Sequence, residues 1–160
     1  MKKLSFIILI IYLFSFACEP EEEYSEIPVV KYKDFNFEIE SIDGFINQVG
    51  FLSFDFIDGN GDIGFYENSD TSIEIEINDI FIYKYTKKNG NYSIADTIKL
   101  IMPYFEEGVY RKYLKGEMKV QIYFMDQVND TIKFDFEIMD RSYNRSNLQS
   151  TPELIVPNWN

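Results

Sequence analysis

The sequence predicts an all-β fold, a single immunoglobulin-like antiparallel β-sandwich of about seven strands. Apolar and polar residues alternate from Asp34 onward, and a period of two is typical of strands that bury one face. No window shows a sustained helical stripe, and the best helical segment, 105–113, allows one or two turns. Turn-forming residues divide the alternating segments, which favours short strands packed in two sheets. The Cys…Trp…Cys pattern of true immunoglobulin domains is absent, so the prediction concerns architecture alone.

The expected strands span 34–42, 48–57, 72–86, 91–101, 117–126, 131–140 and 148–156. Alternation is clearest in the first, third, fifth and sixth of them, where phenylalanine, isoleucine, valine or methionine occupies every second position. Asn89-Gly90 joins the third and fourth strands, and this dipeptide is a strong hairpin signal. The run 127–130 predicts a second hairpin between the fifth and sixth strands. We find no internal repeat and no second domain.

This strand count also places the loops. In such a sandwich the second–third, fourth–fifth and sixth–seventh connections lie at one end. Here those connections are roughly 58–71, 102–116 and 141–147, and they are chemically the richest stretches of the chain. The loops at 43–47, 87–90 and 127–130 are plain turns and belong to the opposite end.

Composition excludes several classes of function. The 160 residues include no histidine and a single cysteine, Cys18. Catalysis by a Ser-His or Cys-His pair, zinc sites rich in histidine or cysteine, and a disulfide are therefore excluded. The formal net charge of −12 argues against a nucleic-acid partner, because phosphate binding needs a basic face.

The first 17 residues have the pattern of an export signal. Lys2 and Lys3 precede the apolar run 4–14, which is interrupted only by Ser5 and is too short to span a bilayer. Ser15-Phe16-Ala17-Cys18 follows and resembles the lipobox of bacterial lipoproteins, which implies that Cys18 is lipidated and becomes the first mature residue. The alternative is an ordinary secretory signal followed by a free cysteine. Removing two lysines and no acid would change the charge from −12 to −14.

An acidic run, Glu19-Pro20-Glu21-Glu22-Glu23, comes next. It is similar to the tag that directs some outer-membrane lipoproteins to the cell exterior, and the alternative is a solvated linker. We therefore expect three parts: a lipoprotein signal peptide at 1–17, a lipidated cysteine with a flexible acidic tether at 18–33, and the β-sandwich domain at 34–160.

The segment Asp58-Gly59-Asn60-Gly61-Asp62-Ile63-Gly64 is the sharpest motif. Its side-chain oxygens recur at every second residue, between glycines that allow a tight loop, and calcium takes six to eight oxygen ligands. The run resembles calcium loops of the Asp-x-Asn-x-Asp kind, but it lacks the flanking helices of an EF-hand. The spacing makes Asp58, Asn60, Asp62 and Asp70 candidate calcium ligands, with Asp55 and Glu67 near enough to complete the shell. The alternative is a turn without metal, since Asp-Gly and Asn-Gly are strong turn formers.

Two further stretches are predicted to form a binding surface. The first is Asp140-Arg141-Ser142-Tyr143-Asn144-Arg145-Ser146-Asn147, followed by Thr151-Pro152-Glu153-Leu154-Ile155-Val156. Together with the 58–64 motif it resembles a group of small outer-membrane lipoproteins of unassigned function, which implies the anchor and the sandwich but no activity. The second stretch is 103–113. Tyrosine and arginine are favoured at interfaces, and the expected surface residues are Tyr104, Tyr110, Arg111, Tyr113, Asp140 and Asn144. The alternatives are a polar loop for the first stretch and a cap on the core for the second.

These features favour a membrane-tethered, non-catalytic binding or assembly module at the outer membrane, with an unidentified protein or glycan partner. One alternative is a carbohydrate-binding module, although the single tryptophan, Trp159, lies at the chain end. The other is a glycan-cleaving enzyme with two carboxylates, which needs no histidine. Asp55, Glu106 and Glu107 would be its candidate acids.

Overall fold

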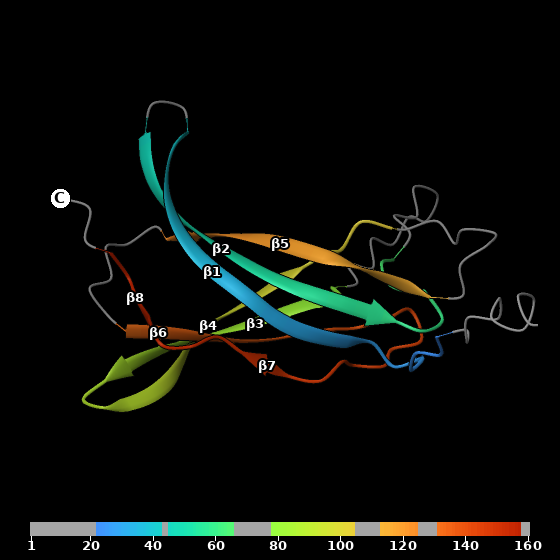
Figure 1. Cartoon of the computed structure of the whole chain (residues 1–160). Helices are drawn as coiled ribbons and strands as arrows, with labels where there is room; N and C mark the ends of the chain where they lie inside the picture. Colours follow the sequence, from blue (N-terminus) through green and yellow to red (C-terminus); the bar gives the residue numbers. More distant parts are fainter. Residues whose placement is uncertain (1–21, 43–44, 66–77, 105–112, 125–130, 158–160) are drawn as a thin grey trace, which may run out of the picture.

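Antiparallel strands form two sheets in the computed structural model, which describes residues 22–42, 45–65, 78–104, 113–124 and 131–157 (Figure 1). These residues contain eight strands and no helix, so the predicted all-β class is confirmed. The strands are β1 (Val29–Ile42), β2 (Phe45–Asp58), β3 (Ile80–Lys88), β4 (Asn91–Leu100), β5 (Leu114–Phe124), β6 (Thr131–Ile138), β7 (Gln149–Ser150) and β8 (Leu154–Ile155). Within the described ranges no helix has the length and apolar character needed to cross a bilayer.

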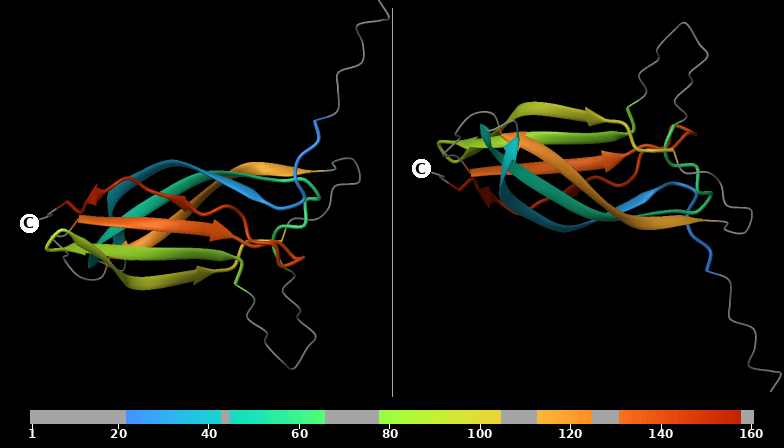
Figure 2. Two further views of the ribbon diagram at one scale, coloured as in Figure 1. Left: turned by 90° about the horizontal axis from the view of Figure 1, so that it is seen from below. Right: turned by 90° about the horizontal axis from the view of Figure 1, so that it is seen from above.

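The first sheet has the order β1-β2-β5, and the second has the order β4-β3-β6-β7 with β8 also paired to β6. The two sheets lie face to face (Figure 2). This division of strands is that of an immunoglobulin-like sandwich, in which the first, second and fifth strands share one sheet. The two short strands β7 and β8 together form the last edge of the second sheet.

The predicted hairpin at 127–130 is wrong. β5 pairs with β2 along its length, from Leu114 opposite Asp58 to Phe124 opposite Gln48, whereas β6 pairs with β3. The connection therefore passes from one sheet to the other. Turn-forming residues indicate where a strand ends, but they do not indicate whether the next strand stays in the same sheet. Residues 127–130 themselves lie outside the described ranges.

Three expected boundaries also differ. β1 begins at Val29, so residues 29–33 of the predicted tether belong to the sheet. β3 begins at Ile80; residues 78–79 of the expected third strand are not in a strand, and 72–77 are not described. The expected last strand is divided near Thr151, whose hydroxyl accepts a hydrogen bond from the Phe134 amide at 3.0 Å. Pro152 follows, and it has no amide hydrogen to continue the ladder.

The alternating pattern builds one aromatic core between the sheets. The rings of Phe54 and Phe136, from opposite sheets, lie 4.9 Å apart, and those of Phe35 and Phe134 stack at 5.3 Å. The Asn89-Gly90 hairpin is confirmed: both residues have positive φ, 51° and 82°, as a type I′ turn requires. These contacts fix the ends of the strands, and therefore the positions of the loops.

Candidate functional site

Three connections meet at one end of the sandwich, as the strand count predicts. Ile63 forms a β-bridge with Asp140, and the Arg141 amide donates to the Asp62 carbonyl at 2.9 Å. Gly64 lies so close to the third connection that a Cβ there would be 2.5 Å from the Pro103 carbonyl oxygen. The described parts of 58–71, 102–116 and 141–147 therefore form one loop end.

An acidic cluster lies at the centre of this loop end. Asp58 ends β2, Asp62 is four residues further on, and Asp140 follows β6 after one residue. One carboxylate oxygen from each of these three side chains lies within 4.8 Å of the other two. Asp58 and Asp140 are each 0% exposed, and Asp62 is half-buried.

Loop chemistry holds Asp62 in place. Gly61 has a φ of 70°, a conformation that a glycine adopts without strain, and it lets the chain turn back. The Asn60 side-chain oxygen accepts a hydrogen bond from the Asp62 amide at 3.4 Å. The Ser142 hydroxyl donates to Asp62 Oδ2 at 2.7 Å. One Asp62 oxygen therefore accepts a hydrogen bond, whereas Oδ1 is buried and has no hydrogen-bond partner among the described residues.

Asp140 is held from the other side by its own turn. The Asn144 backbone amide donates to Asp140 Oδ1 at 2.7 Å, and the Asn144 side-chain amide donates to Oδ2 at 2.9 Å. Tyr143, with a φ of 64°, closes this turn by donating from its amide to the Asp140 carbonyl at 3.0 Å. Asp140 is thus oriented by donors on both oxygens, and an oxygen that accepts one such bond keeps capacity for a second interaction.

Asp58 differs from both. Both of its oxygens are buried, and neither accepts a hydrogen bond of normal geometry from the described residues; the weak approach of the Asp62 backbone amide only lowers its pKa in part. Burial raises the pKa of Asp58 from 3.8 to about 7, and the negative charges of Asp62 and Asp140 contribute to the rise. A buried carboxylate without partners is costly, so this position favours either a proton or a cation.

A second buried carboxyl group belongs to Asp79, which directly precedes β3 and lies beside the start of the 102–116 connection. Its Oδ1 accepts a hydrogen bond from the Met102 amide at 2.6 Å, and its carbonyl accepts one from Met139 at 2.7 Å. Its Oδ2 has no partner among the described residues. Burial raises the pKa of Asp79 to about 6, against the opposing effect of the Met102 hydrogen bond.

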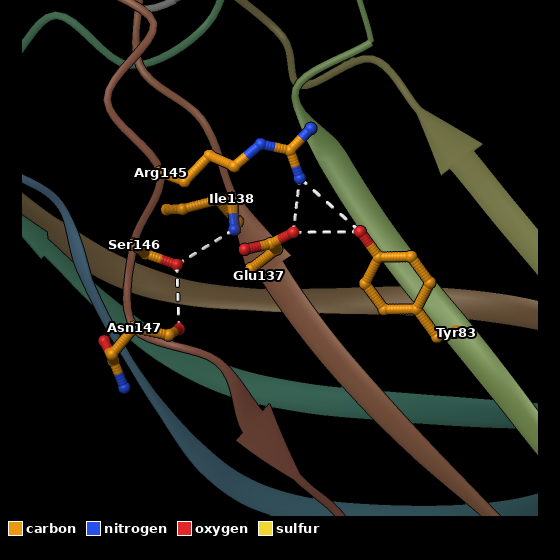
Figure 3. Close-up of polar contacts among 6 residues, drawn as sticks. All are labelled: Tyr83, Glu137, Ile138, Arg145, Ser146 and Asn147. Atoms are coloured by element: carbon orange, nitrogen blue, oxygen red, sulfur yellow. Dashed lines mark hydrogen bonds and ion pairs between the residues drawn. The ribbon is translucent and has the colours of Figure 1, made fainter.

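A polar network on the second sheet supports the 140–147 loop (Figure 3). The Arg145 guanidinium pairs with Glu137, and the Tyr83 hydroxyl donates to Glu137 at 2.9 Å. The Ser146 hydroxyl accepts from the Ile138 amide at 3.0 Å and donates to the Asn147 carbonyl. Strand alternation alone does not reveal this network, because it places Tyr83 and Glu137 only as polar positions on the outer faces of strands.

The predicted metal ligands are only partly brought together. Asp58 and Asp62 meet, but Asn60 is exposed and its oxygen serves the turn. Asp70 and Glu67 lie in the part of the chain that is not described. Asp55 is exposed, on the face of β2 opposite its buried neighbours Phe54 and Phe56, so it does not join the cluster.

The predicted binding surface is also divided. Asp140 is buried in the acidic cluster, and the half-buried Asn144 donates two hydrogen bonds to its carboxylate. Tyr104 is half-buried, with the Arg141 guanidinium 5.0 Å from its ring centre, and Tyr113 packs 4.7 Å from the Tyr24 ring. Tyr110 and Arg111 fall outside the described ranges. A carboxylate at the end of a buried strand pattern, with Asn four residues later, is the sequence signal that points to the buried Asp140 turn.

Comparison of the chain with protein-family models, curated proteins and solved structures gives no match.

Proposed function

We propose that this chain is a membrane-tethered, non-catalytic binding or assembly module whose loop end is organised by a bound calcium ion. One observation supports the ion: Asp58 is fully buried, neither of its oxygens accepts a hydrogen bond of normal geometry from the described residues, and two more carboxylates lie beside it. A divalent cation would supply the positive charge that this arrangement lacks.

The chemistry of the donors selects the kind of ion. The cluster offers only carboxylate oxygens, which suit hard cations, and the chain has no histidine to attract zinc or copper. Calcium accepts irregular geometry and bidentate carboxylates, with water and carbonyl oxygens completing its shell, whereas magnesium demands a near-ideal octahedron. A loop with two positive-φ glycines that brings Asp58 and Asp62 together with Asp140 of another connection fits calcium better.

The same geometry argues against the glycan-cleaving alternative. An acid/base pair stands about 5–10 Å apart on either side of a bound substrate. Here the three carboxylates lie within 4.8 Å of one another, and two of them are fully buried, so a sugar has no access to them. Asp55 lies on the exposed outer face of the first sheet, opposite Glu117 of β5, whose carboxylate pairs with Lys33. Glu106 and Glu107 lie outside the described ranges. These features support a structural ion rather than catalysis.

The tether belongs to the same proposal. The lipobox-like Ser15-Phe16-Ala17-Cys18 supports lipidation at Cys18, and the acidic run 19–23 supports display on the outer face of the outer membrane. The chain enters the domain at the loop end, where Ser25 contacts Gly59. The opposite end, with the Asn89-Gly90 turn, then faces away from the anchor and is free to meet a protein or glycan partner.

Thermal unfolding of the full-length chain tests the ion. Millimolar Ca²⁺ should raise Tm by several degrees, since ligand at a hundredfold Kd adds about 2.7 kcal/mol and each kcal/mol shifts Tm by roughly 2–4 °C at this size. Asp58→Asn should abolish the response. Asp55→Asn is the matched control, because it removes the same charge from an exposed site on the same strand.

Magnesium is the second control, because any divalent ion screens the self-repulsion of an acidic protein. Equal effects of Ca²⁺ and Mg²⁺ on Tm would contradict the site. A normal calcium response in Asp58→Asn would contradict it as well.

A further inference from the structure

The segment that precedes β1 lies directly on the loop that carries the acidic cluster. The Gly59 amide donates to the Ser25 carbonyl at 2.8 Å, and the Tyr24 ring packs edge-on against Tyr113, with centroids 4.7 Å apart. Pro28, the last residue before the strand, is buried. We call residues 24–28 the strap. Figure 2 shows this segment leaving the domain at the loop end.

The contact between the strap and Gly59 is closer than any other residue type allows. A Cβ at position 59 would overlap the Tyr24 carbonyl oxygen and lie 2.6 Å from the Ser25 carbonyl oxygen. Gly59 does not have the positive φ that would by itself call for glycine. The requirement for glycine at this position therefore comes from the strap, and the fit is specific to the docked segment.

The strap and the acidic cluster share one piece of backbone. Gly59 follows Asp58 directly and stands three residues before Asp62, so the amide that holds Ser25 lies between two of the three carboxylates. Without a cation these charges repel one another within a short distance and favour an opened loop. A bound ion draws Asp58 and Asp62 together, and this fixes the direction of the Gly59 amide.

We infer that the ion at Asp58, Asp62 and Asp140 fastens the strap to the loop end, so that ion occupancy sets how the domain is held on its tether. This inference rests on the proposed function. In the ion-loaded protein, residues 24–28 stay on the loop end. In the ion-free protein, the strap detaches from Gly59 and Tyr113.

Thermodynamic linkage between ion binding and strap docking gives the size of the expected effect. If the ion strengthens strap docking, then docking strengthens ion binding by the same factor, and couplings of this kind are typically about 5–150-fold. Gly59→Ala expels the strap by steric overlap and leaves all three carboxylates in place. Tyr24→Ala removes the ring contact with Tyr113 and introduces no clash. Ser25→Ala is the matched control, because it keeps the backbone carbonyl that the Gly59 amide contacts and removes only the hydroxyl that accepts from the Ile27 amide at 3.1 Å within the strap.

Amide exchange of the full-length chain, measured by NMR with Ca²⁺ or with a chelator, reads the state of the strap. Calcium should slow exchange at Gly59 at least fivefold in the parent and in Ser25→Ala. It should not do so in Tyr24→Ala or Gly59→Ala. Glutamyl-protease cleavage at Glu22, Glu23 and Glu26 should follow the same pattern. Calorimetric titration should show that both strap variants still bind calcium, at least fivefold more weakly.

The outcomes separate the two proposals. Calcium binding with unchanged Gly59 exchange would overturn the strap and leave the ion site standing. Parent-like calcium affinity in both strap variants would also overturn it. Absence of calcium binding by the parent chain would overturn the proposed ion and the strap together.

Discussion

At the scale of single residues, the loop end contains two buried carboxyl groups that differ in their surroundings. Asp58 is disfavoured as an anion by burial and by two neighbouring carboxylates, whereas Asp79 is disfavoured by burial and partly relieved by the Met102 amide. A cation lowers the free-energy cost of an ionised Asp58, because its positive charge offsets the repulsion among the three carboxylates. Asp79 has no acidic neighbour that contributes to its shift, so a proton is its natural counterpart.

Replacement of Asp79 by asparagine should therefore stabilise the protein at high pH. The pKa of Asp79 rises from 3.8 to about 6 on folding, so between these values the folded state binds more protons than the unfolded chain. The stabilisation that the folded state gains from a protonated Asp79 is fully present below about pH 4. It is lost as the pH rises to about 6, and above that pH the free energy of unfolding no longer depends on this group. The shift corresponds to an upper bound of about 3 kcal/mol.

The measurement is the Tm difference between Asp79→Asn and the parent from pH 4 to pH 8. We expect it to be small at pH 4 and to reach several degrees in favour of the variant above pH 6, because asparagine keeps the Met102 bond through its carbonyl oxygen. Asp96→Asn, at an exposed site on β4, supplies the matched control. A Tm difference that does not change with pH would contradict the buried-anion argument.

At the scale of elements, the loops depend on a few glycines while the strands depend on alternation. Gly64 and Gly90 have nearly the same φ, 83° and 82°, but very different surroundings. Gly90 is in a hairpin turn with no heavy atom within 4 Å of where a Cβ would lie. Gly64 is pressed against the Pro103 carbonyl. Position 90 requires only a residue that tolerates a positive φ. Position 64 also requires a residue without a Cβ, because the Pro103 carbonyl leaves no space for one.

Alanine at these two positions should separate the two requirements. Gly90→Ala should cost about 1–2 kcal/mol, the usual penalty for a left-handed residue with a Cβ. Gly64→Ala should cost clearly more, because the backbone of 63–65 and 103–104 must also move apart. Denaturant unfolding of both variants gives the comparison through the midpoint concentration. Equal losses would mean that the approach of Gly64 to Pro103 does not constrain the loop end.

At the scale of the whole molecule, local alternation predicted the fold class and the approximate position of most strands, and the loop arrangement of an immunoglobulin-like sandwich predicted the meeting of three loops at one end. Alternation could not predict that β5 and β6 belong to different sheets, because sheet membership depends on which distant strand offers a matching edge. For the same reason Asp140 was expected on a surface. Its burial follows from the bridge with Ile63, a contact between positions 77 residues apart along the chain.

The strap lies between the domain and the predicted lipidation site, Cys18, so the predicted anchor concerns the whole molecule. If Cys18 carries lipid, Cys18→Ser should leave the precursor unprocessed or move the protein out of the membrane fraction, because an acidic domain has no attraction of its own for an anionic lipid surface. Fractionation of expressing cells followed by immunoblotting measures the distribution. Ser15→Leu is the control: it brings the segment closer to the usual lipobox and should leave membrane retention intact. The Cys18→Ser domain should keep the parent's calcium-dependent Tm, since the acidic cluster lies forty residues or more from the anchor along the chain. Membrane retention of Cys18→Ser equal to that of the parent would contradict a lipid anchor, whatever the ion site does.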